Sequence, residues 1–178
     1  MLAAVAALSL AAASHSGSSA SARGLRGFVS GGGNYSIPAA GLDAQFGVVA
    51  VAVGDHATGL SRHRGILGGL DIDFTGKVTC LSVDPINNRA WIGGVITKNR
   101  STHPSFMTTR HQVGHDIWFR VVDYGSIHST VSDRTTFVGF EGDAGFPTSQ
   151  SYCDGMPWPD NDERTWEVDG FVKVETND

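Results

Sequence analysis

The chain has 178 residues, of which 40% are hydrophobic and 17% charged, and this composition excludes an intrinsically disordered protein. Its formal net charge is −5, from 13 Lys and Arg against 18 Asp and Glu, which argues against nonspecific nucleic-acid binding as its function. The length suits one domain. The 23 Gly follow no collagen-like period and therefore predict turns, bulges and loops.

The first segment has the features of an export signal. Residues 2–13 are almost wholly small and apolar, and the Ser/Gly/Ala stretch after them ends in Ala20-Ser21-Ala22, a small-x-small cleavage pattern. The apolar run is shorter than the roughly 20 residues that span a bilayer. No Lys or Arg precedes Arg23, so the basic segment usual in such signals is missing. We predict a signal peptide over 1–22 and a domain over 23–178 that is secreted, periplasmic or at the cell surface, without a membrane span.

The cysteine content fits an oxidising compartment. Cys80 lies in a strand-like run and Cys153 in a Pro/Gly-rich, acidic tail. An even count in an exported protein permits one disulfide, 80–153, which would stabilise the fold by roughly 4 kcal/mol in the chain-entropy model. The alternative is two free thiols. A metal site is not expected, because nothing resembles a CxxC pair.

Strand periodicity dominates the rest of the chain. The segment 46–53 is apolar on both faces, which is typical of a buried central strand. Residues 77–83 and 89–97, joined by the turn 84–88, predict an antiparallel hairpin, and Gly93-Gly94 predicts a bulge or close backbone approach. Gly31-Gly32-Gly33 has no helix after it and is interpreted as a turn. Further strands are expected at 70–74, 113–122, 134–140 and 165–174, with short edge pieces at 27–30, 35–37 and 59–67.

About eight strands joined by turns, with no helices between them, predict an all-β fold. We expect a single antiparallel β-barrel, because closure removes exposed strand edges, and a sandwich is the second choice. In the strand 113–122, the alternation places His115 with Ile117 and Phe119 on one face, and Asp116 with Arg120 on the other.

Several motifs resemble those of a widespread group of exported bacterial β-rich proteins, most of which have no assigned activity. The hairpin pattern G-x-V-x-C-L-x-V followed by N-x-A-x-x-G-G-V is matched at 76–83 and 88–95. The pattern F-R-V-x-D-x-G is matched at 119–125, Asp133-Arg134 matches a following Asp-Arg pair, and Cys153 matches a late Cys. The resemblance covers about residues 27–155 and implies export and a β-rich domain, but no reaction. The insert 98–112 and the acidic tail after Trp158 depart from the pattern.

The insert 98–112 is the main candidate for a ligand-binding loop. It is longer than an ordinary hairpin loop, and long loops at a barrel mouth often cover ligands. A basic loop on an acidic protein would attract an anionic small molecule or a glycan. The alternative is a solvated loop whose charges are balanced by acidic residues of the tail. Its candidate ligand-binding residues are Lys98, Arg100, His103, Arg110 and His111.

Three residues of the strand 113–122 are weak catalytic candidates. His115 could act as an interior acid or base, although a satisfied core histidine is the more ordinary interpretation. Asp116 and Arg120 share the other face, where they could pair with each other or bind a carboxylate. His111 and His115 are four residues apart, about 13 Å along a strand, which is too far for two ligands of one metal.

The tail adds an aromatic candidate. Trp158 lies between two prolines, which stiffen an aromatic side chain suited to contact a sugar or a partner, or else one that covers the barrel end. Asp71 and Asp73 share a strand face, and we interpret them as its polar outer side rather than as an acid/base pair. His56 and His63 flank a Gly-rich segment that is interpreted as a solvated turn.

No nucleophile elbow, P-loop, dinucleotide glycine pattern or HExxH is present, so neither a cofactor nor a metal is expected. Three functions remain open. The first is a secreted, non-catalytic binding or surface-interaction module for an anionic small molecule or a glycan. The second is a small barrel enzyme of the cyclase or isomerase kind, which requires an interior cavity lined by His115 or Arg120. The third is a purely structural extracellular domain. The sequence does not indicate the oligomeric state.

Overall fold

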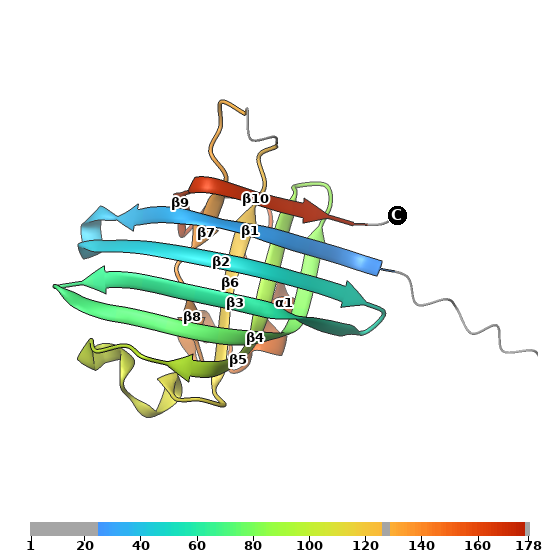
Figure 1. The fold of residues 1–178 in the computed structure, drawn as a ribbon. Helices are drawn as coiled ribbons and strands as arrows, with labels where there is room; N and C mark the ends of the chain where they lie inside the picture. The colour runs from blue at the N-terminus through green and yellow to red at the C-terminus, as the bar shows by residue number, and fades with distance from the viewer. Residues whose placement is uncertain (1–24, 126–128, 177–178) are drawn as a thin grey trace, which may run out of the picture.

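A computed structural model describes residues 25–125 and 129–176, so the predicted signal peptide lies outside the described part. The chain forms an antiparallel sheet in the order β10-β1-β2-β3-β4-β5-β6-β7-β9, with β8 paired to β6, and this sheet curls into a nearly closed barrel (Figure 1). The predicted all-β barrel is confirmed. The strands are β1 (Leu25–Ile37), β2 (Leu42–Val53), β3 (His56–Leu67), β4 (Leu70–Asp84), β5 (Arg89–Asn99), β6 (Asp116–Val122), β7 (Arg134–Thr136), β8 (Gly139–Phe140), β9 (Thr165–Glu167) and β10 (Asp169–Glu175).

The barrel is uneven in strand length. Strands β1 to β5 have 11 to 15 residues each, whereas β6 to β10 have seven or fewer. In Figure 1 the long strands β1 to β4 form the front layer, and β6 and β7 cross behind them at a steep angle. Short helices fill the connections: η1 (Pro38–Ala40), η2 (Pro104–Phe106), η3 (Thr109–His111), η4 (Asp143–Gly145) and α1 (Ser149–Gly155). None of the helices in the described ranges has the length and hydrophobicity needed to cross a bilayer.

Apolar side chains fill the middle of the barrel. Alternate residues of each strand point inward, and the resulting core contains Phe46, Phe74, Phe119, Ile117 and Phe140, all 3% exposed or less. Phe46 meets Phe119 edge to face at 6.0 Å between ring centroids, and Phe74 meets Phe140 at 5.0 Å. The aromatic side chains of this core therefore pack against one another in the middle of the barrel.

The glycine run Gly31-Gly32-Gly33 is not a turn but the middle of β1. A Cβ on Gly32 would lie 2.4 Å from the carbonyl oxygen of Phe46, and one on Gly33 would lie 2.4 Å from that of Asp169. Gly31 has φ +143°, a conformation that side chains disfavour. The glycines are therefore required because β2 and β10 approach β1 too closely for side chains, and the two short edge pieces expected here are one strand.

The hairpin of β4 and β5 is confirmed, and so is its irregularity. The pairing register shifts between Val78 and Cys80, which leaves Thr79 as the extra residue of a bulge opposite Gly93-Gly94. Because of this extra residue, Val78 and Leu81 both face the barrel core, whereas Cys80 faces outward. The inward and outward alternation of side chains along β4 therefore changes at Thr79.

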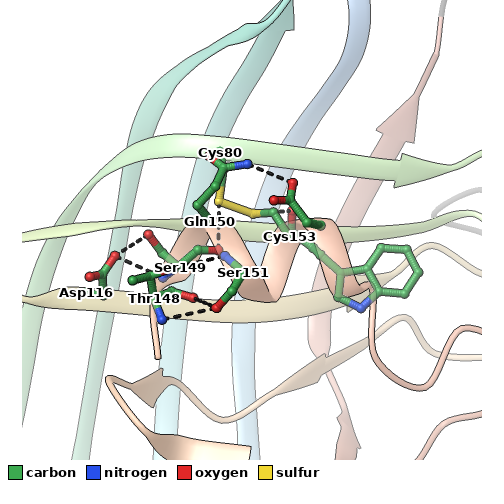
Figure 2. The surroundings of a disulfide bond; sticks show 9 residues. Cys80, Asp116, Thr148, Ser149, Gln150, Ser151 and Cys153 are labelled. Carbon is green, nitrogen blue, oxygen red and sulfur yellow. Dashed lines mark hydrogen bonds between the residues drawn. A yellow bond between two sulfur atoms is a disulfide. The ribbon is translucent and has the colours of Figure 1, made fainter. Parts of the chain in front are cut away.

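The outward side of this bulge carries the disulfide Cys80–Cys153, which confirms the predicted pairing (Figure 2). It ties α1 to the outer face of the barrel across a sequence separation of 73 residues. The helix begins with a capping box, in which the side chain of Thr148 accepts from the amide of Ser151 and the Ser151 hydroxyl accepts from the amide of Thr148. The sequence interpretation missed this helix because its tail position and neighbouring Pro and Gly favoured a loop.

Strand β3 has an unexpected inward face. His63 was expected in a solvated turn, yet it is 2% exposed and meets Phe119 edge to face at 4.5 Å. Neither ring nitrogen has a hydrogen-bond partner among the described residues, and burial lowers the pKa of His63 to about 3. The neighbouring inward positions are the small residues Gly59, Ser61 and Gly65, which leave room for the ring.

Two aspartates close the barrel where strand pairing stops. Asp133 Oδ2 accepts from the amide of Val172 at 2.6 Å, and Asp123 Oδ2 accepts from the amide of Val174 at 3.0 Å. Their other oxygens accept from the amides of Tyr124 and Gly125, each at 2.8 Å. Both carboxylates are buried. They bind the edge of β10 that does not pair with β1, where a neighbouring strand would otherwise lie. Hydrogen bonds to a charged carboxylate are stronger than bonds between neutral groups.

We expect Asp133→Asn to lower the free energy of unfolding by about 1–3 kcal/mol, because one amide oxygen cannot replace two carboxylate oxygens and an NH2 group then faces a backbone N–H. Urea denaturation measures the loss, and hydrogen exchange should show faster exchange at Val172. The control is Asp169→Asn, an exposed residue of β10, which should leave both unchanged. Equal stability of the two variants would contradict the role of this carboxylate in closing the barrel.

The buried imidazole of His63 predicts a pH dependence. The unfolded state takes up a proton near pH 6.5, and the folded state does so only near pH 3, so stability is complete above pH 6.5 and is lost as the pH falls. The slope should approach about 1.4 kcal/mol per pH unit. We expect His63→Leu to flatten the dependence between pH 6 and pH 4.5, measured by urea denaturation, while the exposed His56→Gln does not. An unchanged slope in His63→Leu would exclude this origin.

Candidate functional site

An aromatic cleft of about 330 Å³ lies outside the barrel, beside α1. Its floor contains Trp118 of β6, whose ring stacks on Tyr152 of α1 with centroids 5.6 Å apart. These two residues belong to a second apolar cluster, with Trp91, on the outer face of the sheet. The remaining lining comes from three stretches of the chain: Thr136, Phe137, Val138 and Gly139; Asp143 and Ala144; and Trp158, Arg164 and Trp166.

The tail segment 157–166 is held over this cluster by Arg120. The Arg120 guanidinium is fully buried and donates to the carbonyl oxygens of Pro157, Trp158 and Glu163. Trp91 also donates from its indole N–H to Pro157 at 2.9 Å. The tail therefore forms one wall of the cleft and is anchored from below by side chains of β5 and β6.

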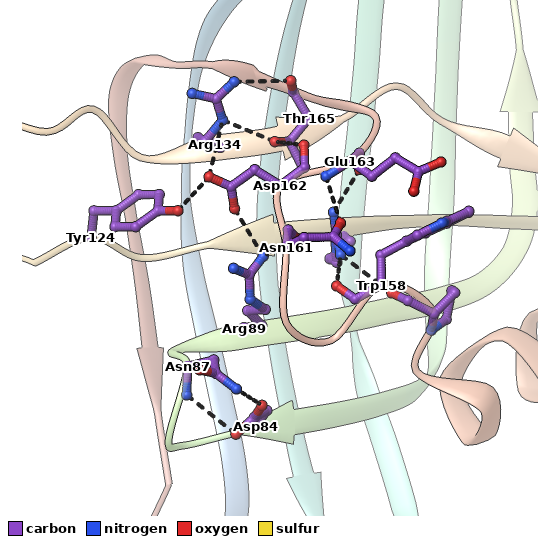
Figure 3. A network of polar contacts seen from close by, with 12 residues as sticks. Asp84, Asn87, Arg89, Tyr124, Arg134, Trp158, Asn161, Asp162, Glu163 and Thr165 are labelled. Atoms are coloured by element: carbon purple, nitrogen blue, oxygen red, sulfur yellow. Dashed lines mark hydrogen bonds and ion pairs between the residues drawn. The ribbon is translucent and has the colours of Figure 1, made fainter.

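A polar network fixes the same segment from its other side (Figure 3). Asp162 accepts from Arg89 at 3.0 Å and from the Tyr124 hydroxyl at 2.5 Å. Burial alone would raise the pKa of Asp162, but the hydrogen bonds from Tyr124 and Arg89 lower it below its ordinary value. Thr165 donates from its amide and its hydroxyl to the Asp162 carbonyl, which closes a turn at 162–165.

Left-handed backbone is concentrated at the cleft. Five non-glycine residues of the described chain have positive φ, and three of them line the cleft: Ala144 at 54°, Trp158 at 57° and Arg164 at 60°. Such conformations cost of order 1–3 kcal/mol each and persist where the surrounding structure imposes them, often at functional sites. Here the carbonyl contacts of Arg120 and the turn at 162–165 impose them on Trp158 and Arg164.

The polar groups of the cleft are few. Trp118 is 3% exposed, and no acceptor within the described ranges takes its indole N–H. Arg164 lies with its guanidinium carbon 4.8 Å from the Trp158 ring centroid. Asp143 is paired with Arg110 at 2.6 Å. Flat aromatic walls with a small number of directional polar groups are typical of a site for a small ring-shaped ligand.

The three weak catalytic candidates all have structural contacts. His115 directly precedes β6 and its side chain is one-third exposed, so it is not a core residue of the barrel. Instead, His115 Nδ1 lies 2.9 Å from Glu141, and the hydrogen bond with His115 is the main reason that the pKa of Glu141 is lowered. Asp116 accepts from the amide of Ser149 at 2.9 Å and so caps α1 (Figure 2). Arg120 is the tail anchor already described.

The insert 98–112 is a folded cover over one end of the barrel. Phe106 packs among core aromatics, and His111 is 2% exposed, with its ring 4.3 Å from that of Phe140. Burial, followed by the charge of Arg110, lowers the pKa of His111. His103 accepts from the amide of Ser105 in a local turn. Of the predicted ligand-binding residues, only Trp158 lines the aromatic cleft, and Arg110 reaches it through Asp143.

The two remaining candidates lie elsewhere on the surface. Arg100 borders an open groove of about 760 Å³ where β1 and β3 end and β2 and β4 begin. Asp71 and Asp73 also border it, with Asp73 bound to Arg62 at 3.0 Å, which agrees with their interpretation as a polar outer face. Lys98 pairs in register with Thr75 on the same face. Tyr35 is the aromatic residue in the lining of this groove, and none of its lining residues is a non-glycine residue with positive φ.

Sequence reasoning found one wall of the cleft and missed the others. The prolines around Trp158 marked it as unusual, whereas Trp118 and Trp166 looked like ordinary strand residues. Arg164 carried no signal in the sequence, because its position depends on the turn at 162–165.

Comparison with known proteins identified no relative of this chain. No protein-family model matches the chain, no curated protein matches its sequence, and no solved structure matches its fold.

Proposed function

We propose that this protein is an exported, non-catalytic binding module that takes a sugar ring of a glycan into the aromatic cleft. The observation that carries the proposal is the cleft itself, in which Trp118, Trp158 and Trp166 surround a hollow of about 330 Å³. That volume suits one small ring. The apolar C–H face of a sugar packs on aromatic rings such as those of Trp158 and Trp166.

The scaffold supports binding rather than chemistry. The cleft rests on a filled barrel and on a tail held by Arg120 and the Cys80–Cys153 disulfide, so its walls are preorganised. Export is supported by that disulfide, since disulfides persist mainly in oxidising compartments. The apolar segment 2–13 and the resemblance to exported bacterial proteins point the same way.

Tryptophan fluorescence offers a direct test, because three of the four Trp residues line the cleft. We expect titration with a panel of oligosaccharides to shift the emission for at least one class and to raise the melting temperature. Trp158→Ala should weaken binding at least about tenfold, through loss of stacking and buried area.

The matched control is Phe171→Ala. Phe171 is a half-exposed aromatic residue on the outer face of β10, away from the cleft lining, and its removal should leave binding unchanged. The proposal fails if no oligosaccharide class alters emission or melting temperature, or if Phe171→Ala and Trp158→Ala weaken binding equally.

A further inference from the structure

We propose that the aromatic cleft selects a sugar that carries a carboxylate, such as a uronic acid unit, and that Arg164 recognises this group. The inference rests on the proposed glycan binding and names the class of glycan. It is drawn from the distribution of charge around Trp158.

Two guanidinium groups lie close to the indole ring of Trp158. The guanidinium carbon of Arg164 is 4.8 Å from the ring centroid and that of Arg120 is 5.8 Å away. Both distances are within the range of cation–π contact. Trp158 therefore lies close to the positive charges of Arg120 and Arg164, although the chain as a whole has a net charge of −5.

The Arg120 guanidinium has no direct carboxylate partner, although the charges of the nearby Asp162 and Glu163 favour its charged form. Its hydrogen bonds go to backbone carbonyls, and within the described part of the chain no carboxylate lies within 4.0 Å of its guanidinium. Because Arg120 is fully buried, water screens its field poorly. It thus contributes a fixed positive potential beneath the cleft.

Two acidic residues in or beside the cleft lining already have basic partners. Asp143, the carboxylate in the lining, is paired with Arg110 at 2.6 Å. Glu163 lies 3.7 Å from Arg164, and both side chains are more than half exposed. An exposed pair of this kind is weak, so Arg164 can exchange Glu163 for a ligand carboxylate at low cost.

The backbone of Arg164 also indicates a role in recognition. A non-glycine residue at φ 60° is strained, and glycine at this position would be easier to accommodate. The turn at 162–165 and the bond from Arg120 to the Glu163 carbonyl keep the guanidinium over the aromatic wall. A planar guanidinium in this position can bind a carboxylate through two parallel hydrogen bonds.

The test compares matched neutral and acidic ligands, namely oligomers of galactose and of galacturonate, by calorimetry and tryptophan fluorescence. We expect the acidic oligomer to bind at least about tenfold more tightly at low ionic strength, with the difference shrinking as salt is added. Arg164→Gly should remove this preference, leave affinity for the neutral oligomer within about threefold, and not lower the melting temperature. Arg164→Gln removes the charge but keeps the strained backbone, and it should also lose the preference.

The control is Asn88→Gly, which relieves a left-handed residue (φ 49°) in the turn between β4 and β5 and should keep the full preference. Equal affinity of the unaltered protein for both oligomers, with binding abolished by Trp158→Ala, would overturn the inference and leave the proposed function standing. Binding of neither oligomer nor any other glycan would overturn both. A preference that survives in Arg164→Gly, or a marked fall in its melting temperature, would reject Arg164 as the recognising group.

Discussion

The fold depends on the carboxylates of Asp123 and Asp133, which bind the free edge of β10. An unfinished barrel leaves a row of backbone amides with no partner, and each buried amide left unpaired costs about 1–3 kcal/mol. These two residues flank the connection from β6 to β7, so they reach β10 without another strand. Burial is the main reason that the pKa of Asp133 is raised, and the charge of Asp123 adds to it, so closing the barrel has an electrostatic cost.

This closure explains where a site can form. Asp123 and Asp133 close the edge of β10, and Phe46, Phe74 and Phe119 pack in the barrel interior. The cleft lined by aromatic residues lies on the outside of this barrel. Arg120, Asp123 and Asp133 belong to the motifs that resemble those of exported bacterial proteins, yet all three bind backbone groups of the C-terminal region. These motifs therefore describe how the tail is attached and do not specify a reaction.

Strand patterning predicted the barrel and the β4–β5 hairpin, because both depend on the local alternation of side chains and on turn residues. The disulfide was predicted from the even number of cysteines. Strand patterning failed at β3, where the outward Leu60 and Ile66 are apolar and the inward His63 is polar, so local hydrophobicity opposes the true orientation. It failed again at His115, since the strand begins one residue later, at Asp116, and the His115 side chain is one-third exposed. Strand patterning could not predict the cleft, because Trp118, Trp158 and Arg164 are distant in sequence. They lie together because Arg120 holds the tail segment 157–166 against β6.

The residues that stabilise the barrel differ from the residues that line the cleft. The carboxylates of Asp123 and Asp133 and the terminal nitrogens of the Arg120 guanidinium bind backbone groups and hold the structure in place. Of the two strained residues, Trp158 packs against the cluster of Trp91, Trp118 and Tyr152, whereas the Arg164 side chain is 56% exposed. Burial therefore compensates for the strained backbone at Trp158 more than at Arg164, where the strain is consistent with the recognition role proposed for this side chain.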